Sequence, residues 1–331
     1  AMNSVPVVDI SAALTGDSDA VAEAAAAIDS ACVNSGFFII TGTGVPTDLV
    51  DRVMATSREF FALPYAEKQR VAPPGLEHYR GYLGLDTTSL AATLGDEVPP
   101  DLCESFNVNR FDDPETRERA WFDGADAALH PNLWPSEPAA LRPTLEEYYA
   151  VMERLCLAML PIFAEALGLA PNWFDEKVAE HTALLLVNWY PPVAGGLHPG
   201  QLRRGGHTDY GAFTVVAAEQ IPGLQIFIDD AWTDVPAVTD GFVVNLGDLM
   251  ARWTNDRWVS TLHRVVVPEG ADRGRDRMSV PYFFQPSYGA LVETIPTTIT
   301  ETNPAKYGPV VSGKWITAKS MSMLEDQDEA S

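Results

Sequence analysis

Cysteine is scarce in this sequence. The 331 residues include only Cys32, Cys103 and Cys156, which lie far apart and form no CxxC motif. An odd number of widely spaced cysteines argues against a disulfide framework and against a zinc knuckle. We therefore expect each cysteine to be a small buried apolar residue rather than a nucleophile, and the protein to work in the reducing cytoplasm.

Basic residues are also few. The chain carries 22 Lys and Arg residues against 46 Asp and Glu residues, which gives a formal net charge of −24. Such a surface repels the phosphates of nucleic acids and anionic membranes. No apolar stretch approaches the length of a membrane span, and the start of the chain has no basic and apolar segment of the secretory type. We expect neither nucleic acid nor membrane to be a partner.

The two halves of the chain differ in their hydrophobic pattern. The first half shows helical spacing and long loops, and it predicts helices over 18–34, 47–62 and 143–168. From about residue 182, short β-runs follow one another with turns between them, at 183–190, 212–218, 224–228, 242–245, 258–267 and 277–285. Many short strands at this spacing indicate an antiparallel sandwich or jelly roll.

We therefore predict a mainly β fold with α additions, built as one domain over residues 1–331. A helical and loop-rich N-terminal part extends to about residue 180. A β core covers about 181–290, and a C-terminal extension covers about 291–331.

Two of the six histidines lie in an informative pattern. His207 and Asp209 are separated by one residue at the start of a β-run. Side chains alternate along a strand, so these two point to the same face and can bind one ion. His263 lies in a later β-run. Two histidines and one carboxylate on one face of an octahedral ion leave three positions open, which is typical of oxygen-activating non-haem Fe(II).

Two further pairs repeat the same spacing of two residues. Arg277 and Ser279 precede an apolar run, and a guanidinium beside a hydroxyl can clamp a carboxylate with two hydrogen bonds. Asn188 and Tyr190 lie on an earlier strand, and both side chains donate hydrogen bonds. They suit a second anchor for a dicarboxylate cosubstrate.

With these residues the chain resembles the isopenicillin-N-synthase-like family of Fe(II)/2-oxoglutarate dioxygenases, from Val5 to about Tyr288. The motifs that carry the resemblance are Gly-Phe-Phe-Ile-Ile-Thr-Gly, Asn-Trp-Tyr-Pro, Gly-His-Thr-Asp-Tyr-Gly, Pro-Gly-Leu-Gln-Ile, Asn-Leu-Gly-Asp, Ser-Thr-Leu-His-Arg-Val and Arg-Met-Ser. Two departures stand out. Leu186 occupies a position where many plant members have Arg, and a charged insertion, 269–276, lies between His263 and Arg277.

The resemblance implies a distorted double-stranded β-helix core with N-terminal helices. It implies that Fe(II) is bound by His207, Asp209 and His263, and that the far carboxylate of 2-oxoglutarate pairs with Arg277 and Ser279. Tyr190 and Asn188 would contact the cosubstrate nearer the metal. O2 would be the oxidant, and a C–H bond of a small organic metabolite would be hydroxylated, desaturated or cyclised with release of succinate and CO2, as in secondary metabolism.

The substrate is expected to be partly apolar and to lie against seven residues. The expected pocket residues are Tyr79, Arg80, Tyr82, Phe106, Leu186, Arg252 and Phe284. Four arginines, Arg80, Arg203, Arg204 and Arg252, could each bind a substrate carboxylate, although a structural role is the commoner one for an arginine. The oligomeric state is expected to be a monomer or a weak dimer.

Three alternatives stay open at the level of sequence. An isopenicillin-N-synthase-type oxidase uses no 2-oxoglutarate and has the same Arg and Ser pair. An ethylene-forming type breaks down the cosubstrate itself. A non-catalytic metal-binding β-sandwich protein would keep the metal site without turnover. The intact His207, Asp209 and His263 set argues against the last of these, and the Asn188 and Tyr190 pair favours a 2-oxoglutarate enzyme.

Overall fold

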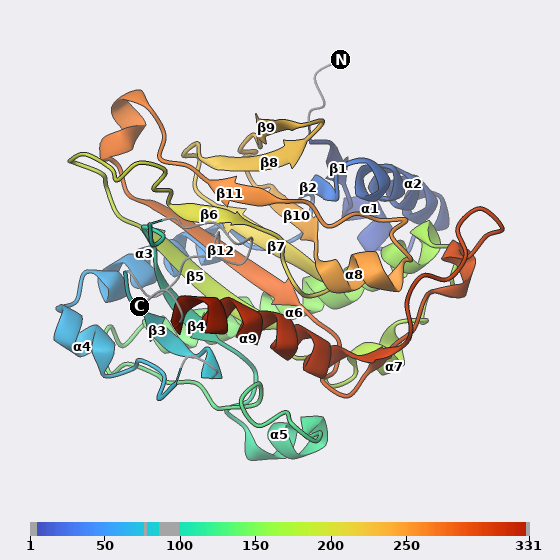
Figure 1. Cartoon of the computed structure of the whole chain (residues 1–331), viewed down its shortest axis with the longest axis horizontal. Helices are drawn as coiled ribbons and strands as arrows, with labels where there is room; N and C mark the ends of the chain where they lie inside the picture. Colours follow the sequence, from blue (N-terminus) through green and yellow to red (C-terminus); the bar gives the residue numbers. More distant parts are fainter. Residues whose placement is uncertain (1–4, 76–77, 86–98, 329–331) are drawn as a thin grey trace.

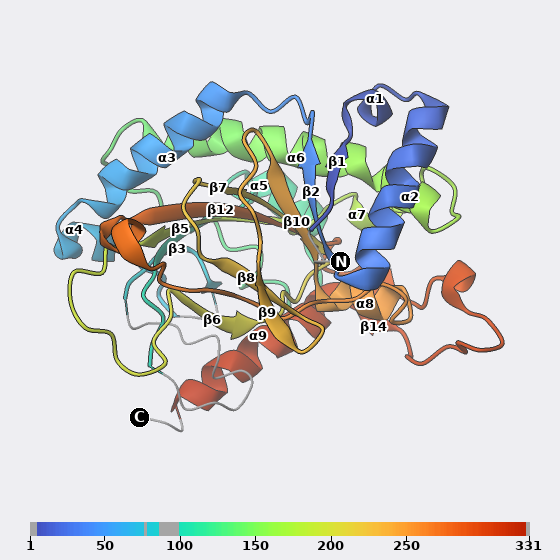
Figure 2. The same cartoon turned by 90° about the horizontal axis from the view of Figure 1, so that it is seen from above.

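The computed structural model describes residues 5–75, 78–85 and 99–328, with the side chains of 322–328 left out. Two sheets face each other (Figures 1 and 2). The larger has eight strands in the order β1-β2-β10-β7-β12-β5-β4-β3, and the smaller has the order β6-β11-β8-β9. This arrangement confirms the expectation of a β-rich core with helical additions.

The strands are short, and all but one of the pairings between them are antiparallel. The strands of the larger sheet are β1 (Val7–Asp9), β2 (Phe37–Thr41), β3 (Gly81–Leu83), β4 (Glu104–Val108), β5 (Leu184–Tyr190), β7 (Phe213–Ala218), β10 (Phe242–Leu246) and β12 (Arg277–Phe284). Those of the smaller sheet are β6 (Arg204–His207), β8 (Leu224–Ile228), β9 (Ala231–Asp234) and β11 (His263–Val265), and a separate ribbon pairs β13 (Leu291–Val292) with β14 (Val310–Val311).

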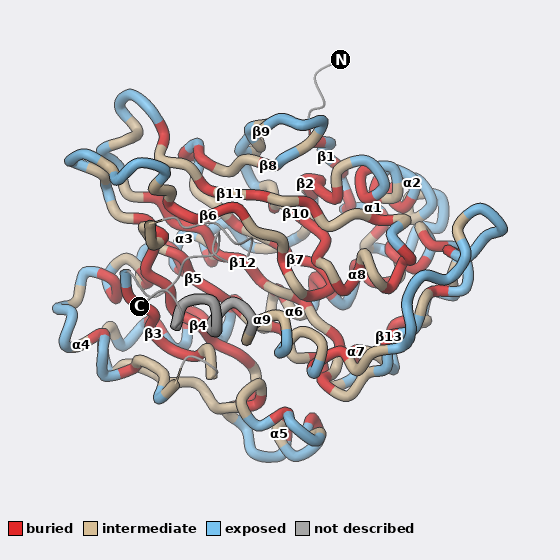
Figure 3. Tube along the Cα trace, viewed as in Figure 1, coloured by how far each residue is buried: buried red, intermediate tan, exposed pale blue. Residues whose placement is uncertain are grey.

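Helices cover the outer face of the larger sheet, where Figure 2 shows α3 and α6 above the strands, α2 beside them and the smaller sheet below. The helices are α1 (Ser11–Leu14), α2 (Ser18–Asn34), α3 (Thr47–Phe61), α4 (Tyr65–Gln69), α5 (Pro114–Ala120), α6 (Leu141–Ala166), α7 (Asp175–Val178), α8 (Asp248–Trp253) and α9 (Ser312–Asp328). The residues between the helices and the larger sheet are mostly buried, and the central strands are almost continuously buried in Figure 3. One continuous apolar core therefore supports both the helices and the sheet.

Two parts of the sequence-based prediction need correction. The predicted strand 258–267 shrinks to β11, because the segment before it packs against α2: the Val259 N–H donates to the Cys32 carbonyl and the Trp258 indole donates to Asp29. The long loops expected in the first half of the chain include two strands, β3 and β4, which join the larger sheet at one end. These strands were not predicted because the Pro and Gly residues around them interrupt the alternating pattern by which a strand is recognised.

Three smaller expectations can be compared with the structure. Cys32, Cys103 and Cys156 are all buried and free, as predicted. The charged insertion forms a surface turn, η3 (Gly270–Gly274), and none of the residues in that turn is buried. Among the described residues, no helix is long and apolar enough to cross a membrane.

Candidate active site

Two histidines and an aspartate meet where β6 and β11 lie side by side. His207 at the end of β6 pairs in register with His263 at the start of β11, and Asp209 follows two residues after His207. The Asp209 Oδ1 atom lies 3.7 Å from His207 Nε2 and 3.5 Å from His263 Nε2. The ligand atoms of the three residues all lie within 4.8 Å of one another. The structure thus brings together the three residues that the sequence singled out.

The backbone orients both imidazole rings. His207 Nδ1 lies 2.8 Å from the Gly205 carbonyl oxygen, and His263 Nδ1 lies 3.0 Å from the Thr261 carbonyl oxygen. A carbonyl only accepts, so each Nδ1 carries a proton, and each Nε2 is directed toward Asp209, where it can offer a lone pair to a metal. Outer partners of this kind fix the tautomer of metal-binding histidines.

The carboxylate of Asp209 is oriented in the same way. Its Oδ2 atom accepts hydrogen bonds from Thr214 Oγ1 at 2.6 Å and from Asn245 Nδ2 at 2.7 Å. The Oδ1 atom is left facing the two Nε2 atoms. Three atoms that can act as acceptors converge in a buried space, and a divalent cation between them would offset the repulsion between the lone pairs and the carboxylate. The donor set therefore fits a divalent metal of the non-haem iron type.

Electrostatics favour the protonation states that a metal needs at His207 and Asp209. Burial and the neighbouring His263 lower the pKa of His207 to about 3, so its imidazole is neutral near pH 7. Burial opposes ionisation of Asp209, but the two imidazoles and the Thr214 hydroxyl outweigh it and hold the pKa of that carboxyl well below its usual value. A neutral imidazole and an ionised carboxylate are the forms that bind metal ions. At His263, burial opposes protonation, but the neighbouring Asp209 carboxylate outweighs it and raises the pKa, so a metal ion would displace a proton there.

A second polar group lies on β5 and β12 near this cluster. The two strands pair so that Arg277 faces Tyr190 and Ser279 faces Asn188. The Ser279 hydroxyl lies 3.3 Å from the Tyr190 hydroxyl and 3.4 Å from Asn188 Nδ2. The four residues predicted to hold the cosubstrate are thus neighbours across one strand pair.

Arg277 carries an unused donor. Its Nε donates to the Ile221 carbonyl at 3.1 Å, while Nη1 is buried and has no hydrogen-bond partner among the described residues. Burying a guanidinium without a carboxylate partner costs free energy, and a bound ligand that accepts its hydrogen bond would offset that cost. Burial lowers the pKa of Arg277, yet an arginine stays charged at neutral pH. The orphaned N–H fits one end of a dicarboxylate.

One cavity of about 280 Å³ joins the histidine cluster to this polar group. It is lined by His207, Asp209, His263, Arg277, Ser279, Asn188 and Tyr190, and also by Tyr79, Arg80 and Leu186 from the expected substrate group. Tyr79 has a positive φ of 45°, which is uncommon for a residue other than glycine. Arg80 fixes that conformation, because its guanidinium donates to the carbonyls of Tyr79, Ala128 and His130.

The structure places four of the expected substrate residues away from the cavity lining, which corrects their predicted position. Tyr82 donates its hydroxyl to Glu104, and Phe106 packs on Phe60 with ring centroids 4.9 Å apart. Phe284 packs on Phe213 on the helix-covered side of the sheet, and its neighbour Phe283 lines the cavity instead because strand side chains alternate.

Arg252 is the fourth, and it contacts the C-terminal segment instead of the cavity. Its guanidinium donates to the Gly308 carbonyl and lies 4.7 Å from the ring of Tyr307. Arg203, another candidate carboxylate binder, is fully buried and donates to the Arg275 and Pro191 carbonyls. Neither arginine is among the described residues that line the cavity.

Sequence reasoning missed the contribution of α9. Helix α9 is dark red in Figure 1. Its residues Ile316, Thr317, Ser320 and Met321 form part of the cavity lining. Their spacing of one, four and five residues is that of one helix face and could have marked this segment. Helix α9 was not predicted to be part of the site, because the segment ends in acidic residues and lies far along the chain from the motifs.

Comparison with known proteins agrees with this geometry. Residues 5–137 match a family model described as "non-haem dioxygenase in morphine synthesis N-terminal", and residues 181–286 match the "2OG-Fe(II) oxygenase superfamily" model. Validamycin A dioxygenase from Streptomyces hygroscopicus subsp. limoneus is 35% identical over 98% of this chain and 87% of its own length. The chain belongs to the 2OG-Fe(II) oxygenase superfamily.

Other similar proteins match over most of their length. The 2-oxoglutarate-dependent dioxygenase citB of Monascus ruber is 35% identical over 85% of this chain and 84% of its own length. A full-length Neurospora crassa protein, solved as a crystal structure in complex with alpha-KG and thymine, superposes with a TM-score of 0.83, at 31% identity, over 96% of this chain and 97% of that one. This 2OG-Fe(II) oxygenase is therefore an oxidoreductase that uses Fe(II), 2-oxoglutarate and O2 on a small molecule.

Proposed function

We propose that this oxygenase binds Fe(II) through His207 Nε2, Asp209 Oδ1 and His263 Nε2, and that it oxidises a C–H bond of a compact, uncharged metabolite. The convergence of three oriented acceptor atoms in one cavity carries the metal part of the proposal. When bound, Fe(II) couples the oxidative decarboxylation of 2-oxoglutarate to oxidation of the substrate by O2. The products are succinate, CO2 and the oxidised substrate.

The protein holds the cosubstrate at its far end. We propose that Arg277 and Ser279 bind its distal carboxylate, with the free Nη1 of Arg277 as the main donor. Tyr190 closes the other side of that site, with its ring 5.5 Å from the Arg277 guanidinium. Asn188 lies on the same strand as Tyr190, and its Oδ1 atom accepts a hydrogen bond from Arg204 of β6. Because these groups are buried, their charge-assisted bonds are stronger than in water.

The cavity charges support an uncharged substrate. Among the residues that the structure describes, three arginines line it, and two of them are already committed: Arg80 to three carbonyls, and Arg204 to Asn188 and Asp101. The third, Arg277, is assigned to the cosubstrate. The remaining walls offer hydroxyl groups, such as Tyr79 and Ser320, beside apolar groups such as Leu186. A neutral molecule with hydroxyl or amide groups on an apolar frame suits these walls.

Tyr79 is the residue that we assign to substrate binding on the wall contributed by the loop after α4. Burial raises the pKa of its phenol, so the hydroxyl is a neutral donor at physiological pH. Its strained backbone, fixed by Arg80, directs the ring toward the cavity at a cost of about 1–3 kcal/mol that packing elsewhere must offset. Strain of this kind is commonly found where a side chain must be presented to a ligand.

We further propose that the two facing sheets form a distorted double-stranded β-helix, and that residues 1–331 make a single catalytic domain. The continuous apolar core that joins α2, α3 and α6 to the larger sheet supports this assignment. Helix α9 also belongs to it, because it contributes to the lining of the same cavity.

The test is a screen of Fe(II)-loaded protein with 2-oxoglutarate and a library of neutral hydroxylated and heterocyclic metabolites, scored by succinate release and by the mass of the product. We expect succinate and a product 16 Da heavier or 2 Da lighter than the substrate to appear together, where 16 and 2 are roughly the masses of one oxygen and two hydrogens. Product formation without 2-oxoglutarate would favour the oxidase alternative. A preference for carboxylate substrates would overturn the assignment of an uncharged substrate.

A further inference from the structure

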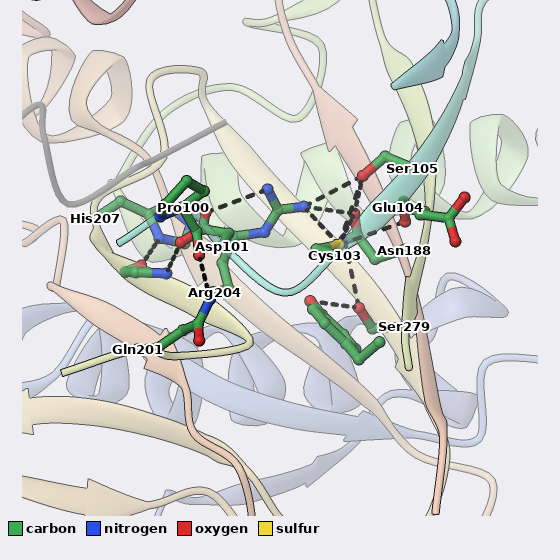
Figure 4. A network of polar contacts seen from close by, with 12 residues as sticks. Pro100, Asp101, Cys103, Glu104, Ser105, Asn188, Gln201, Arg204, His207 and Ser279 are labelled. Carbon is green, nitrogen blue, oxygen red and sulfur yellow. Dashed lines mark hydrogen bonds and ion pairs between the residues drawn. The ribbon is translucent and has the colours of Figure 1, made fainter. Parts of the chain in front are cut away.

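Arg204, which the sequence offered only as a possible binder of a substrate carboxylate, lies at the wall of the cavity where the cosubstrate is proposed to bind. Arg204 lies at the start of β6 and is 5% exposed. Its Nη2 donates to Asn188 Oδ1 at 2.6 Å, and its Nη1 lies 3.8 Å from Asp101 Oδ2 (Figure 4). Asp101 is held in turn by the backbone N–H of Gly205 at 2.8 Å. The guanidinium thus links the strand of the first histidine to the strand of Asn188.

A second donor approaches the same oxygen. The Ser105 hydroxyl on β4 donates to Asn188 Oδ1 at 2.8 Å, and it is also buried. A guanidinium has only donors, so the Asn188 atom that faces Arg204 must be the oxygen. Its amide nitrogen is consequently turned the other way, toward Ser279 Oγ at 3.4 Å.

This orientation matters for the cosubstrate. With its oxygen held by Arg204 and Ser105, and approached by the Cys103 thiol at 3.6 Å, Asn188 presents its NH2 group to the side of the cavity where Ser279 and Tyr190 lie. The flipped amide would place an acceptor there, and an acceptor repels a carboxylate. A side-chain amide without these two donors could sample both orientations, whereas the observed network admits one.

We propose that Arg204 and Ser105 are positioning residues of the cosubstrate site, which lock the Asn188 amide with its NH2 group toward 2-oxoglutarate. This inference rests on the proposed cosubstrate role of Asn188. Neither residue is required to touch the ligand: Ser105 is not among the described residues that line the cavity, and the Nη2 atom of Arg204 is occupied by Asn188. Asp101 balances the charge of Arg204, so the pair adds no net charge to the site.

Ser105→Ala gives the cleaner test, because it removes one donor without leaving an unpaired charge. The dissociation constant of 2-oxoglutarate is measured by anaerobic calorimetry on the Fe(II)-loaded protein. We expect it to rise about fivefold, the equivalent of one neutral hydrogen bond, with the substrate KM changed much less. Ser105→Thr keeps the hydroxyl and should restore the affinity.

Arg204→Met should raise the same constant by about tenfold or more, since the bond that it removes is charge-assisted. It is combined with Asp101→Asn, because an unpaired buried Asp101 would destabilise the fold on its own. Thermal unfolding of each variant separates loss of affinity from loss of fold. Should the Arg204 variant fail to fold, the Ser105 series still decides the matter.

The decisive measurement is a double-mutant cycle with Asn188→Ala. If Ser105 acts through Asn188, then Ser105→Ala has no further effect on the 2-oxoglutarate constant once Asn188 is alanine. Additive effects of Ser105→Ala and Asn188→Ala on the 2-oxoglutarate dissociation constant would overturn the inference. It would also be overturned if Asn188→Ala bound 2-oxoglutarate weakly while Ser105→Ala and the Arg204 variant both bound it normally. A normal constant in Asn188→Ala itself would overturn the cosubstrate role of Asn188 in the proposed function, and the inference with it.

Discussion

His207 and His263 face each other across the β6–β11 pair, in register, with ring centroids 4.3 Å apart. Strand pairing sets that separation, so two histidines far apart in the sequence become neighbours without any loop having to place them. Asp209 completes the group from the turn after β6, and its free oxygen faces both rings. A site placed on strands is held more rigidly than a site on loops, which suits a metal that must keep a fixed geometry.

The outer partner of Asp209 gives the first prediction. Asn245→Ala removes the hydrogen bond of 2.7 Å to Asp209 Oδ2 and leaves the three proposed ligands intact. We expect iron affinity to fall roughly 10–100-fold, which is the range found when outer partners of metal ligands are removed. Competition with a chelator, followed by iron analysis, measures the loss. Asp209→Ala is the reference variant and should bind no iron at this site; activity of that variant with iron supplied would mean that Asp209 is not a ligand.

The second prediction concerns Arg277. Arg277→Lys keeps the charge but loses the planar fork, so we expect 2-oxoglutarate affinity to fall about tenfold or more, which corresponds to roughly 1.4 kcal/mol or more. The effect should appear in the cosubstrate constant before it appears in the substrate KM. An anaerobic titration of the Fe(II) protein checks this, and Arg273→Lys on the exposed surface turn is a matched control. Normal binding in Arg277→Ala would remove Arg277 from the cosubstrate site.

The third prediction tests the substrate wall. Tyr79→Phe deletes one hydroxyl and keeps the ring, so we expect the substrate KM to rise about fivefold or more while 2-oxoglutarate binding stays unchanged. Uncoupled succinate release, measured against product formed, should increase because the substrate is held less firmly. An unchanged KM together with full coupling would show that the phenol makes no contact with substrate.

The fourth prediction concerns stability and explains why Tyr82 is not a pocket residue. Glu104 is buried and accepts from both Lys68, at 2.6 Å, and the Tyr82 hydroxyl. Lys68→Met removes the cation and leaves a buried carboxylate, which should cost about 3–5 kcal/mol of unfolding free energy. Combining it with Glu104→Gln should recover most of that loss. Denaturant unfolding measures both variants, and equal stability of the wild type and Lys68→Met would contradict the assignment.

Motif spacing could predict the cosubstrate pairs because alternation along a strand is a local property, and Arg277 with Ser279 needed only that rule. The same rule named His207 and Asp209 for a different reason than the structure gives: β6 ends at His207, and the segment that follows brings Asp209 beside it. The substrate wall could not be predicted in this way. Tyr82 lies on the edge strand β3 and Phe106 on its neighbour β4, and the way these short strands face depends on their pairing with each other and with β5. The network of Arg204 joins three separate segments, namely residues 101–105, Asn188 on β5 and Arg204 on β6.

The last prediction concerns α9, which the sequence left without a role. Ile316 lies on the face of α9 that lines the cavity, whereas Lys314, two residues earlier, points outward and pairs with Asp123 at 3.0 Å. Ile316→Phe adds bulk to the α9 wall of the cavity and leaves the Arg277 wall on β12 unchanged, so we expect bulky substrates to lose kcat/KM by about tenfold or more while small ones and 2-oxoglutarate are affected little. Lys314→Ala is the matched control on the same helix and should behave like the wild type, because an exposed ion pair contributes at most about 1 kcal/mol.

The measurement is kcat/KM for a series of substrates of increasing size, together with the dissociation constant of 2-oxoglutarate. A uniform loss across the whole series would mean that the variant disturbs the packing of α9 rather than the size of the cavity. A series identical to that of the wild type would mean that α9 does not bound the substrate site.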